Sequence, residues 1–241
     1  MNDNLDDIKN NILKLYDNEL DKDNYLNTYS LVYDYCNIDC VKTDLYKKGF
    51  YNHIYFNLYE FYNEIKLLLY NIVFEYRLKL LESKQILKDY VDIFFCFIKN
   101  SFKLNNIFSY LNKTFIKDKK TIELNFSVYE IIDLCRILWF ETIVLDISKS
   151  LKEIILQKIY DYRNEYETNF NYINNVLESY KIIYVRNIEY LYSKDLHLVT
   201  DENDKNVILK NYFEDDFIFE TNEYYLLKKK NIEKKNDKKY F

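Results

Sequence analysis

The sequence has almost none of the two residues that most often break regular structure: its 241 residues include one glycine, Gly49, and no proline. A GxGxxG turn or a Walker loop needs several glycines at fixed spacing, so neither phosphate-binding motif is present. The GxSxG, HExxH and EF-hand signatures are absent as well. These absences argue against the enzyme classes that such motifs define, and we expect a non-catalytic protein without a cofactor.

An excess of basic charge and long apolar runs are also missing. The chain has 34 basic and 39 acidic residues and a net charge of −5, which does not fit a duplex-DNA binder. No stretch approaches the roughly 18 charge-free apolar residues of a membrane-spanning helix. The N-terminal sequence MNDNLDD is acidic and polar, unlike a signal peptide. We therefore expect a cytoplasmic or nuclear location.

Side chains that bind metals are few, namely Cys36, Cys40, Cys96, Cys135, His53 and His197. Cys36 and Cys40 are close in sequence, but a structural zinc site would need a second close pair. We expect reduced, buried thiols and no metal. His53 lies among aromatic and aliphatic residues, which predicts a half-buried structural role, whereas His197 lies in a polar stretch and is expected to be solvated.

Apolar residues are abundant, at 49% of the chain with 27 Tyr and 17 Phe, and their spacing is helical nearly everywhere. The pattern predicts an all-α fold of about eight helices. Ser83 is predicted to cap a helix through Ile98, and a further helix to run from Ser101 to Ile116. Ser127 with Glu130 matches a capping box, which predicts one long helix reaching Tyr166.

One stretch offers more apolar surface than packing within a single helical bundle needs. Residues 25–36 form a helix that is apolar on nearly all sides, so one face can pack inside the protein while another meets a partner. Tyrosine suits such an interface because it joins a large apolar ring to a polar tip. Residues 104–113 form a more ordinary amphipathic helix, with Asn106, Tyr110 and Lys113 on a face beside the apolar one.

These two stretches resemble the N-terminal region of a cullin. Tyr25 to Cys36 is similar to the second helix of the first cullin repeat, with matches at Tyr25, Tyr29, Val32, Tyr33, Tyr35 and Cys36, whereas Thr28 stands where the family often has an apolar residue. Tyr110 to Lys113 resembles the fifth helix, with Lys113 in place of arginine. Val128 to Trp139 is similar to the opening of a second repeat, and two later runs also resemble that repeat, namely Leu156 to Arg163 and Tyr212 to Tyr225.

The resemblance implies an elongated stack of five-helix cullin repeats, closest to the SCF-type cullin. It divides the chain into a first repeat over residues 1–120, a partial second repeat over 121–230 and a basic, disordered tail over 231–241. An unfinished repeat predicts an exposed apolar patch near the C-terminal helices. The family's C-terminal domain, which recruits a RING protein, would be absent.

The implied function is that of a ubiquitin-ligase scaffold that binds a Skp-type adaptor of BTB/POZ fold carrying an F-box-like substrate receptor. The implied adaptor-binding residues are Tyr25, Leu26, Tyr29, Tyr33, Asn106, Tyr110 and Lys113. Two alternatives remain at this point: a generic α-helical interaction module unrelated to ubiquitin transfer, and a nucleic-acid binder that uses the basic tail of residues 228–239.

Overall fold

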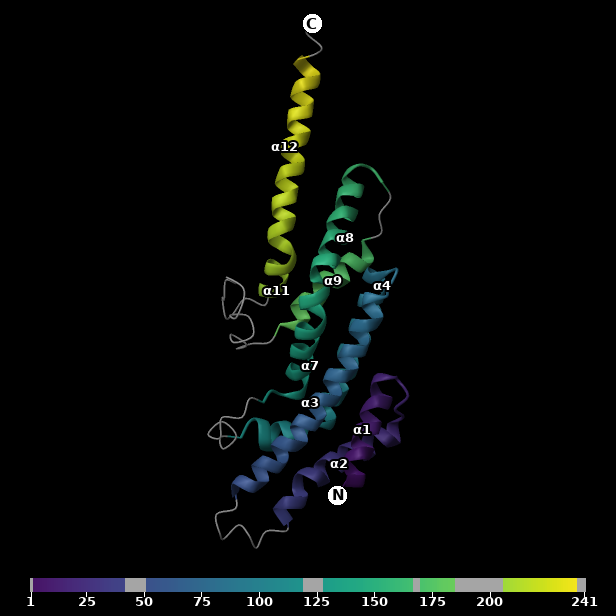
Figure 1. Cartoon of the computed structure of the whole chain (residues 1–241), viewed down its shortest axis with the longest axis vertical. Helices are drawn as coiled ribbons and strands as arrows, with labels where there is room; N and C mark the ends of the chain where they lie inside the picture. Colours follow the sequence, from purple (N-terminus) through teal and green to yellow (C-terminus); the bar gives the residue numbers. More distant parts are fainter. Residues whose placement is uncertain (1, 42–50, 119–127, 167–169, 185–205, 238–241) are drawn as a thin grey trace. The chain divides into compact units, whose positions relative to one another are not determined.

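The computed structural model describes residues 2–41, 51–118, 128–166, 170–184 and 206–237, and all regular structure in these ranges is helical (Figure 1). The predicted all-α class is confirmed. Within the same ranges no helix combines the length and apolar character needed to cross a membrane.

Contacts between residues divide the chain into two compact units, unit 1 from Met1 to Asp146 and unit 2 from Ile147 to Phe241. The expected repeat boundary between residues 120 and 121 lies inside unit 1. A compact unit need not coincide with a sequence repeat, so the division into repeats stays a prediction.

Unit 1 is built from helices that pack on one another, including pairs that are not consecutive in the chain. Its elements are α1 (Asn2–Tyr16), α2 (Lys22–Val41), α3 (Tyr51–Leu81), α4 (Ile86–Ile107), α5 (Ser109–Leu111), the π-helical turn η2 (Asn112–Ile116), α7 (Ile131–Trp139) and the π-helical turn η3 (Phe140–Val144). Helix α1 packs on α2, α3 and α4, and α2 also packs on α4 and α5. Helix α7 packs on α3 and α4, which places it within the same core.

The centre of that core is a cluster of aromatic rings around Trp139, which is fully buried. The Trp139 ring centroid lies 4.9 Å from that of Phe97 and 5.2 Å from that of Phe94. Tyr90 and Tyr76 complete the contacts at 5.9 and 6.5 Å. Rings from α3 and α4 therefore hold α7 in place through stacked and edge-to-face pairs.

Ser83 does not cap a helix, because α4 begins at Ile86 with Gln85 at its N-cap position. Two further predicted helix boundaries are also wrong. Ser101 does not start a helix, because α4 continues through it to Ile107. Its side chain is fully buried, where Oγ donates to the Phe97 carbonyl at 2.9 Å and lies 2.9 Å from the Tyr16 hydroxyl oxygen. A serine that bonds the preceding turn of its own helix leaves that helix unbroken.

The second correction concerns the long helix expected from Ser127, a residue outside the described ranges. Helix α7 begins at Ile131, and Glu130 occupies the N-cap position without making a side-chain capping bond. The helical run then passes through η3 into α8 (Leu145–Arg163) and ends three residues before Tyr166. The capping box is therefore wrong, and another source must satisfy the first amides of α7.

Unit 2 contains α8, α9 (Asn171–Ile183), α11 (Val207–Leu209), the π-helical turn η4 (Lys210–Glu214) and α12 (Asp215–Asp237). Helix α11 packs on α9. The core of unit 2 includes the buried residues Ile155, Ile173, Val176, Tyr180, Ile208 and Phe213. Side chains join α12 to α8 at three points, through the ion pair of Lys152 with Asp216, a bond from Arg163 to Thr221 and a bond from Tyr224 to the Arg163 carbonyl. Because α12 extends to Asp237, it enters the stretch that was expected to be a disordered tail.

Two helices end in the left-handed turn that glycine usually provides. Asn18 after α1 and Glu165 after α8 have φ of 61° and 69°. In each case the next amide reaches back five residues, from Glu19 to the Lys14 carbonyl at 2.8 Å and from Tyr166 to the Asp161 carbonyl at 3.1 Å. These are Schellman C-caps, and the chain builds both of them without glycine.

Candidate protein-binding surface

Helix α2 buries one narrow stripe and exposes three large hydrophobic side chains. Thr28 and Val32 are fully buried and Cys36 nearly so, at spacings of four residues along one face. The buried hydroxyl of Thr28 is satisfied by donating to the Asn24 carbonyl at 2.6 Å. Thr28 therefore faces the interior, so its difference from the apolar residue common in cullins affects packing and leaves the exposed face unchanged.

The exposed part of α2 consists of Leu26, Tyr29 and Tyr33, whose side chains are 53%, 39% and 44% accessible. Exposed apolar side chains that follow one another along a helix form a surface that suits a protein partner.

The structure brings the two tyrosine-containing stretches together, because α2 packs along α4 and α5. The Tyr110 hydroxyl on α5 donates to Asn37 Oδ1 at 2.8 Å, and the Tyr33 and Tyr110 rings lie 4.6 Å apart, edge to face. Near the start of α2, the Tyr25 hydroxyl donates to the Lys103 carbonyl at 3.3 Å. These contacts fix the position of α2 relative to the end of α4.

The seven residues implied by the resemblance fall into two groups by exposure. Tyr25 and Tyr110 are half-buried and join the helices, and neither lies in the interior. The other five are exposed, namely Leu26, Tyr29, Tyr33, Asn106 and Lys113. The structure thus offers three apolar side chains on α2, with one amide on α4 and one cation on η2, as groups available to a partner.

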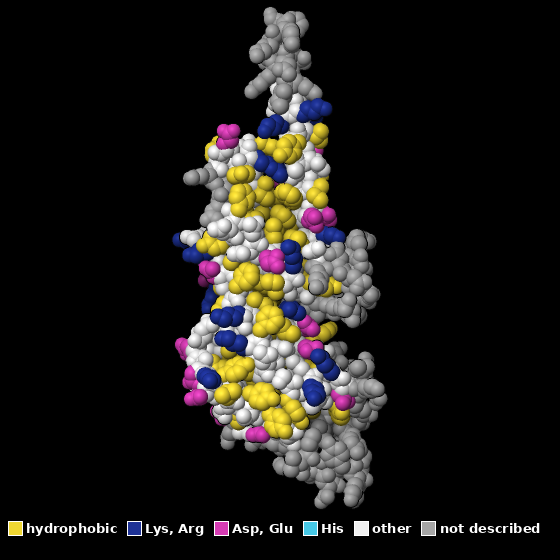
Figure 2. All heavy atoms as spheres, turned by 180° about the vertical axis from the view of Figure 1, so that it is seen from behind, with side chains coloured by type: hydrophobic (Ala, Val, Ile, Leu, Met, Phe, Trp, Pro, Cys, Tyr) yellow, Lys and Arg dark blue, Asp and Glu magenta, His cyan; other side chains and the backbone are white. Residues whose placement is uncertain are grey.

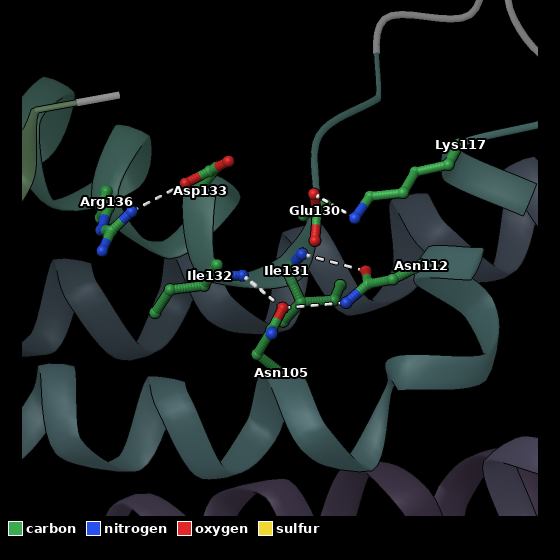
Figure 3. Close-up of polar contacts among 8 residues, drawn as sticks. All are labelled: Asn105, Asn112, Lys117, Glu130, Ile131, Ile132, Asp133 and Arg136. Carbon is green, nitrogen blue, oxygen red and sulfur yellow. Dashed lines mark hydrogen bonds and ion pairs between the residues drawn. The ribbon is translucent and has the colours of Figure 1, made fainter. Parts of the chain in front are cut away.

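The end of α4 and the turn η2 are in turn held by two asparagines, Asn105 and Asn112, which we call the asparagine cap (Figure 3). Asn112 Oδ1 accepts from the Ile131 amide at 3.2 Å, and Asn105 Oδ1 accepts from the Ile132 amide at 3.1 Å. Asn112 Nδ2 also donates to Asn105 Oδ1 at 2.9 Å. The first two amides of α7 are thus capped by side chains from elsewhere in the chain.

Charged groups surround the asparagine cap without entering it. Lys117 Nζ lies 2.8 Å from Glu130 Oε1, and Arg136 Nη1 lies 2.9 Å from Asp133 Oδ1 (Figure 3). Partial burial raises the pKa of the Asp133 carboxyl, which the neighbouring Arg136 partly opposes. The result is a rigid base under η2, the element that carries Lys113.

Sequence reasoning missed three residues of this arrangement, Asn37, Asn105 and Asn112. Asn112 was noted only as part of the Tyr-Leu-Asn-Lys run. The signal was present nonetheless, since Glu130 is a poor N-cap and an asparagine on the apolar face of a neighbouring helix needs a buried partner.

The thiols and metal-binding side chains offer no reaction centre in the described part of the chain. Cys36 and Cys135 are buried, Cys96 is half-buried, and the side chains of Cys40, His53 and His197 lie outside the described residues. Burial raises the pKa of Cys135 to about 11, so it stays a neutral thiol near pH 7. No group of three or more metal-ligating side chains occurs among the described residues.

Packed helix pairs with an exposed tyrosine-rich face define a helical protein-interaction domain. A family model described as the cullin alpha solenoid domain matches residues 5–241. The chain therefore belongs to the cullin family, whose members are generally non-catalytic scaffolds that assemble with protein partners in ubiquitin ligases. A comparison with the curated proteins finds no match.

Proposed function

We propose that this chain binds a Skp-type adaptor of BTB/POZ fold, in the manner of the SCF-type cullin, and thereby joins a substrate receptor of the F-box kind to a ubiquitin ligase. The observation that supports this most directly is the exposed row of Leu26, Tyr29 and Tyr33 on α2, a helix that packs on α4 and α5. Adaptor binding here needs no chemistry from the chain, only a firm apolar surface with polar edges.

The rest of the assembly follows from the same proposal. A RING protein would join through a C-terminal cullin domain, and the scaffold would act in the cytoplasm or the nucleus. The alternative of a helical module unrelated to ubiquitin transfer is disfavoured by the family match over residues 5–241.

The experiment is a calorimetric titration of the purified chain with the Skp-type adaptor of the same organism. We expect saturable 1:1 binding that Tyr29→Ala weakens by about 2 kcal/mol, roughly thirtyfold, as for an interface anchor. Leu26→Ala should weaken binding in the same direction. Tyr25 and Tyr110 are poorer choices, because their hydroxyls tie α2 to its neighbours and their loss would disturb the fold.

The matched control is Leu67→Ala on α3, because Leu67 is 56% accessible, close to the 53% of Leu26, and lies outside the proposed surface. Binding that is equally weakened by Leu67→Ala, or a folded chain that does not bind the adaptor, would contradict the proposal. Circular dichroism of each variant establishes that the helices are intact.

A further inference from the structure

A second surface, in unit 2, combines aromatic rings with cations that have no carboxylate partner among the described residues. The end of α8 and the middle of α12 enclose two adjoining cavities of about 590 and 530 Å³. Arg163, Glu165, Tyr224 and Lys228 line both of them. Figure 2 shows hydrophobic and basic side chains close together over the C-terminal helices, below the grey end of the chain.

The guanidinium of Arg163 lies among three rings. Its Cζ is 5.3 Å from the centroid of Tyr224, 5.7 Å from that of Phe217 and 5.8 Å from that of Tyr225. One nitrogen, Nη2, donates to Thr221 Oγ1 at 2.8 Å. The rings and this bond fix the plane of the guanidinium, while its other N–H groups have no acceptor among the described residues.

Lys228 supplies a second cation at the same place, with Nζ 5.8 Å from the Tyr224 ring centroid. Within the described ranges, no carboxylate forms an ion pair with Arg163 or Lys228. By contrast, Lys152 on α8 is paired with Asp216 of α12. The two cations in the cavities are therefore available to an anion from outside.

The surroundings distinguish between kinds of anion. Tyr162 and Tyr225 are 60% and 57% accessible, and Leu227 is 57% accessible, so the cavities are bordered by apolar surface that a free inorganic ion would not use. The Glu165 carboxylate lines both cavities and repels a doubly charged phosphate more strongly than a single carboxylate. A planar, oriented guanidinium also matches the two oxygens of a carboxylate.

We infer that these cavities form a docking site for an acidic peptide segment of a partner protein, in which one aspartate or glutamate carboxylate binds Arg163 and Lys228 and flanking apolar side chains pack on Tyr162, Tyr224 and Tyr225. This site lies in unit 2 and does not depend on adaptor binding by the α2 surface. It also accounts for the exposure of apolar side chains on α12 beside basic ones.

The test is selection of peptides from a random library displayed on phage, with the full chain as the target. The best peptide is then measured by fluorescence anisotropy. We expect enrichment of one acidic position flanked by apolar residues, and at least a tenfold loss of affinity when that acid is changed to its amide. Lys228→Gln should cause a similar loss of affinity. Arg163→Lys should also weaken binding, because lysine keeps the positive charge but lacks the planar pair of N–H donors that can bind both carboxylate oxygens.

The matched control is Lys229→Gln, which makes the same change of charge at the next residue of α12, outside both cavities. Equal losses from Lys228→Gln and Lys229→Gln would overturn the site, as would failure to enrich acidic peptides. Tighter binding of a phosphoserine version of the peptide would overturn the carboxylate assignment. Dimerisation of the chain that Lys228→Gln abolishes would instead identify a second copy as the occupant.

Discussion

Asparagine performs, in this chain, several tasks that other proteins divide among glycine, serine and aspartate. Asn18 turns the chain after α1 with φ of 61°, and its side chain also bonds Cys96 and Asn100. Asn37 accepts from Tyr110, and Asn112 caps α7. An amide both donates and accepts, and it tolerates the left-handed region better than most side chains, which explains why one residue type serves in all these places.

Glu165 adopts a left-handed backbone conformation that glycine would adopt without steric strain. It holds φ of 69° at the end of α8 although its side chain is exposed and makes no bond to another described residue that would favour this conformation. We expect Glu165→Gly to raise the free energy of unfolding of the structure around it by about 1 kcal/mol, because glycine removes the steric cost of the left-handed turn. Chemical denaturation followed by circular dichroism measures this change.

The matched substitution is Asn18→Gly, at the same position of the same kind of cap. No gain is expected there, because glycine would lose the bonds of the Asn18 side chain to Cys96 and Asn100. Equal stabilisation by both substitutions would show that the side-chain bonds of Asn18 contribute nothing.

At the scale of elements, the asparagine cap connects the proposed adaptor surface to the core. It attaches α4 and η2 to α7, and α7 is anchored by Trp139 in the aromatic cluster. Its two members share a hydrogen bond, so neither acts alone. The position of Lys113 on η2 therefore depends on residues that have no contact with a partner.

We expect Asn112→Ala to lower the free energy of unfolding by about 2 kcal/mol, since it removes a cap and leaves the buried amide of Ile131 without an acceptor. Asn105→Ala should cost a similar amount, and the double substitution should cost clearly less than the sum of the two. Urea denaturation of the three variants gives the coupling. Additive losses would mean that the Asn105–Asn112 bond does not contribute.

The same elements show how far sequence reasoning reaches. Helical periodicity was sufficient for the all-α class, because apolar residues repeat at helical spacing nearly everywhere in the chain. Periodicity failed at Ser101, where a residue type that often begins a helix is buried within one. It also failed at Glu130, because the amides that follow it at the start of α7 are capped by Asn112 and Asn105, which lie far earlier in the sequence. Such contacts depend on the folded chain: an asparagine on an apolar helix face indicates that a buried partner exists, but no local pattern says which amide it is.

The candidate surface could be predicted from the sequence only in part. The resemblance to cullins placed its seven residues on two stretches, and the structure brings these stretches together. Exposure was not predictable residue by residue, because α2 is apolar on nearly all sides and only packing decides that Thr28 is buried and Tyr29 is accessible. The cavities of unit 2 require α8 and α12 to meet, far apart in sequence.

At the scale of the whole molecule, each compact unit has its own buried core, and Trp139, the only tryptophan of the chain, belongs to unit 1. We therefore expect tryptophan fluorescence to follow the unfolding of unit 1 alone, whereas circular dichroism follows the helices of both units. The two transitions in urea should not coincide. Coincident transitions would show that the units unfold as one.

Raising the pH tests whether the fluorescence transition belongs to unit 1. Burial, together with Cys96 and Asp17, raises the pKa of Tyr76 in unit 1 from 10.0 to about 12. Between these values the Tyr76 hydroxyl keeps its proton in the folded chain and loses it in the unfolded chain, so the contribution of Tyr76 to the stability of unit 1 is complete below pH 10 and falls as the pH rises toward 12. The fluorescence transition should move to lower urea concentration in this range, and Tyr76→Phe should reduce the movement.

The ring cluster around Trp139 also has an optical consequence. The chain holds 27 tyrosines and a single indole, and the Tyr76 and Tyr90 rings lie within 6.5 Å of that indole. Phenol rings so close to an indole pass their excitation to it before they emit. Light absorbed by Tyr76 and Tyr90 should therefore leave the folded protein as tryptophan emission, which makes the molecule its own label-free reporter of whether α3, α4 and α7 are assembled.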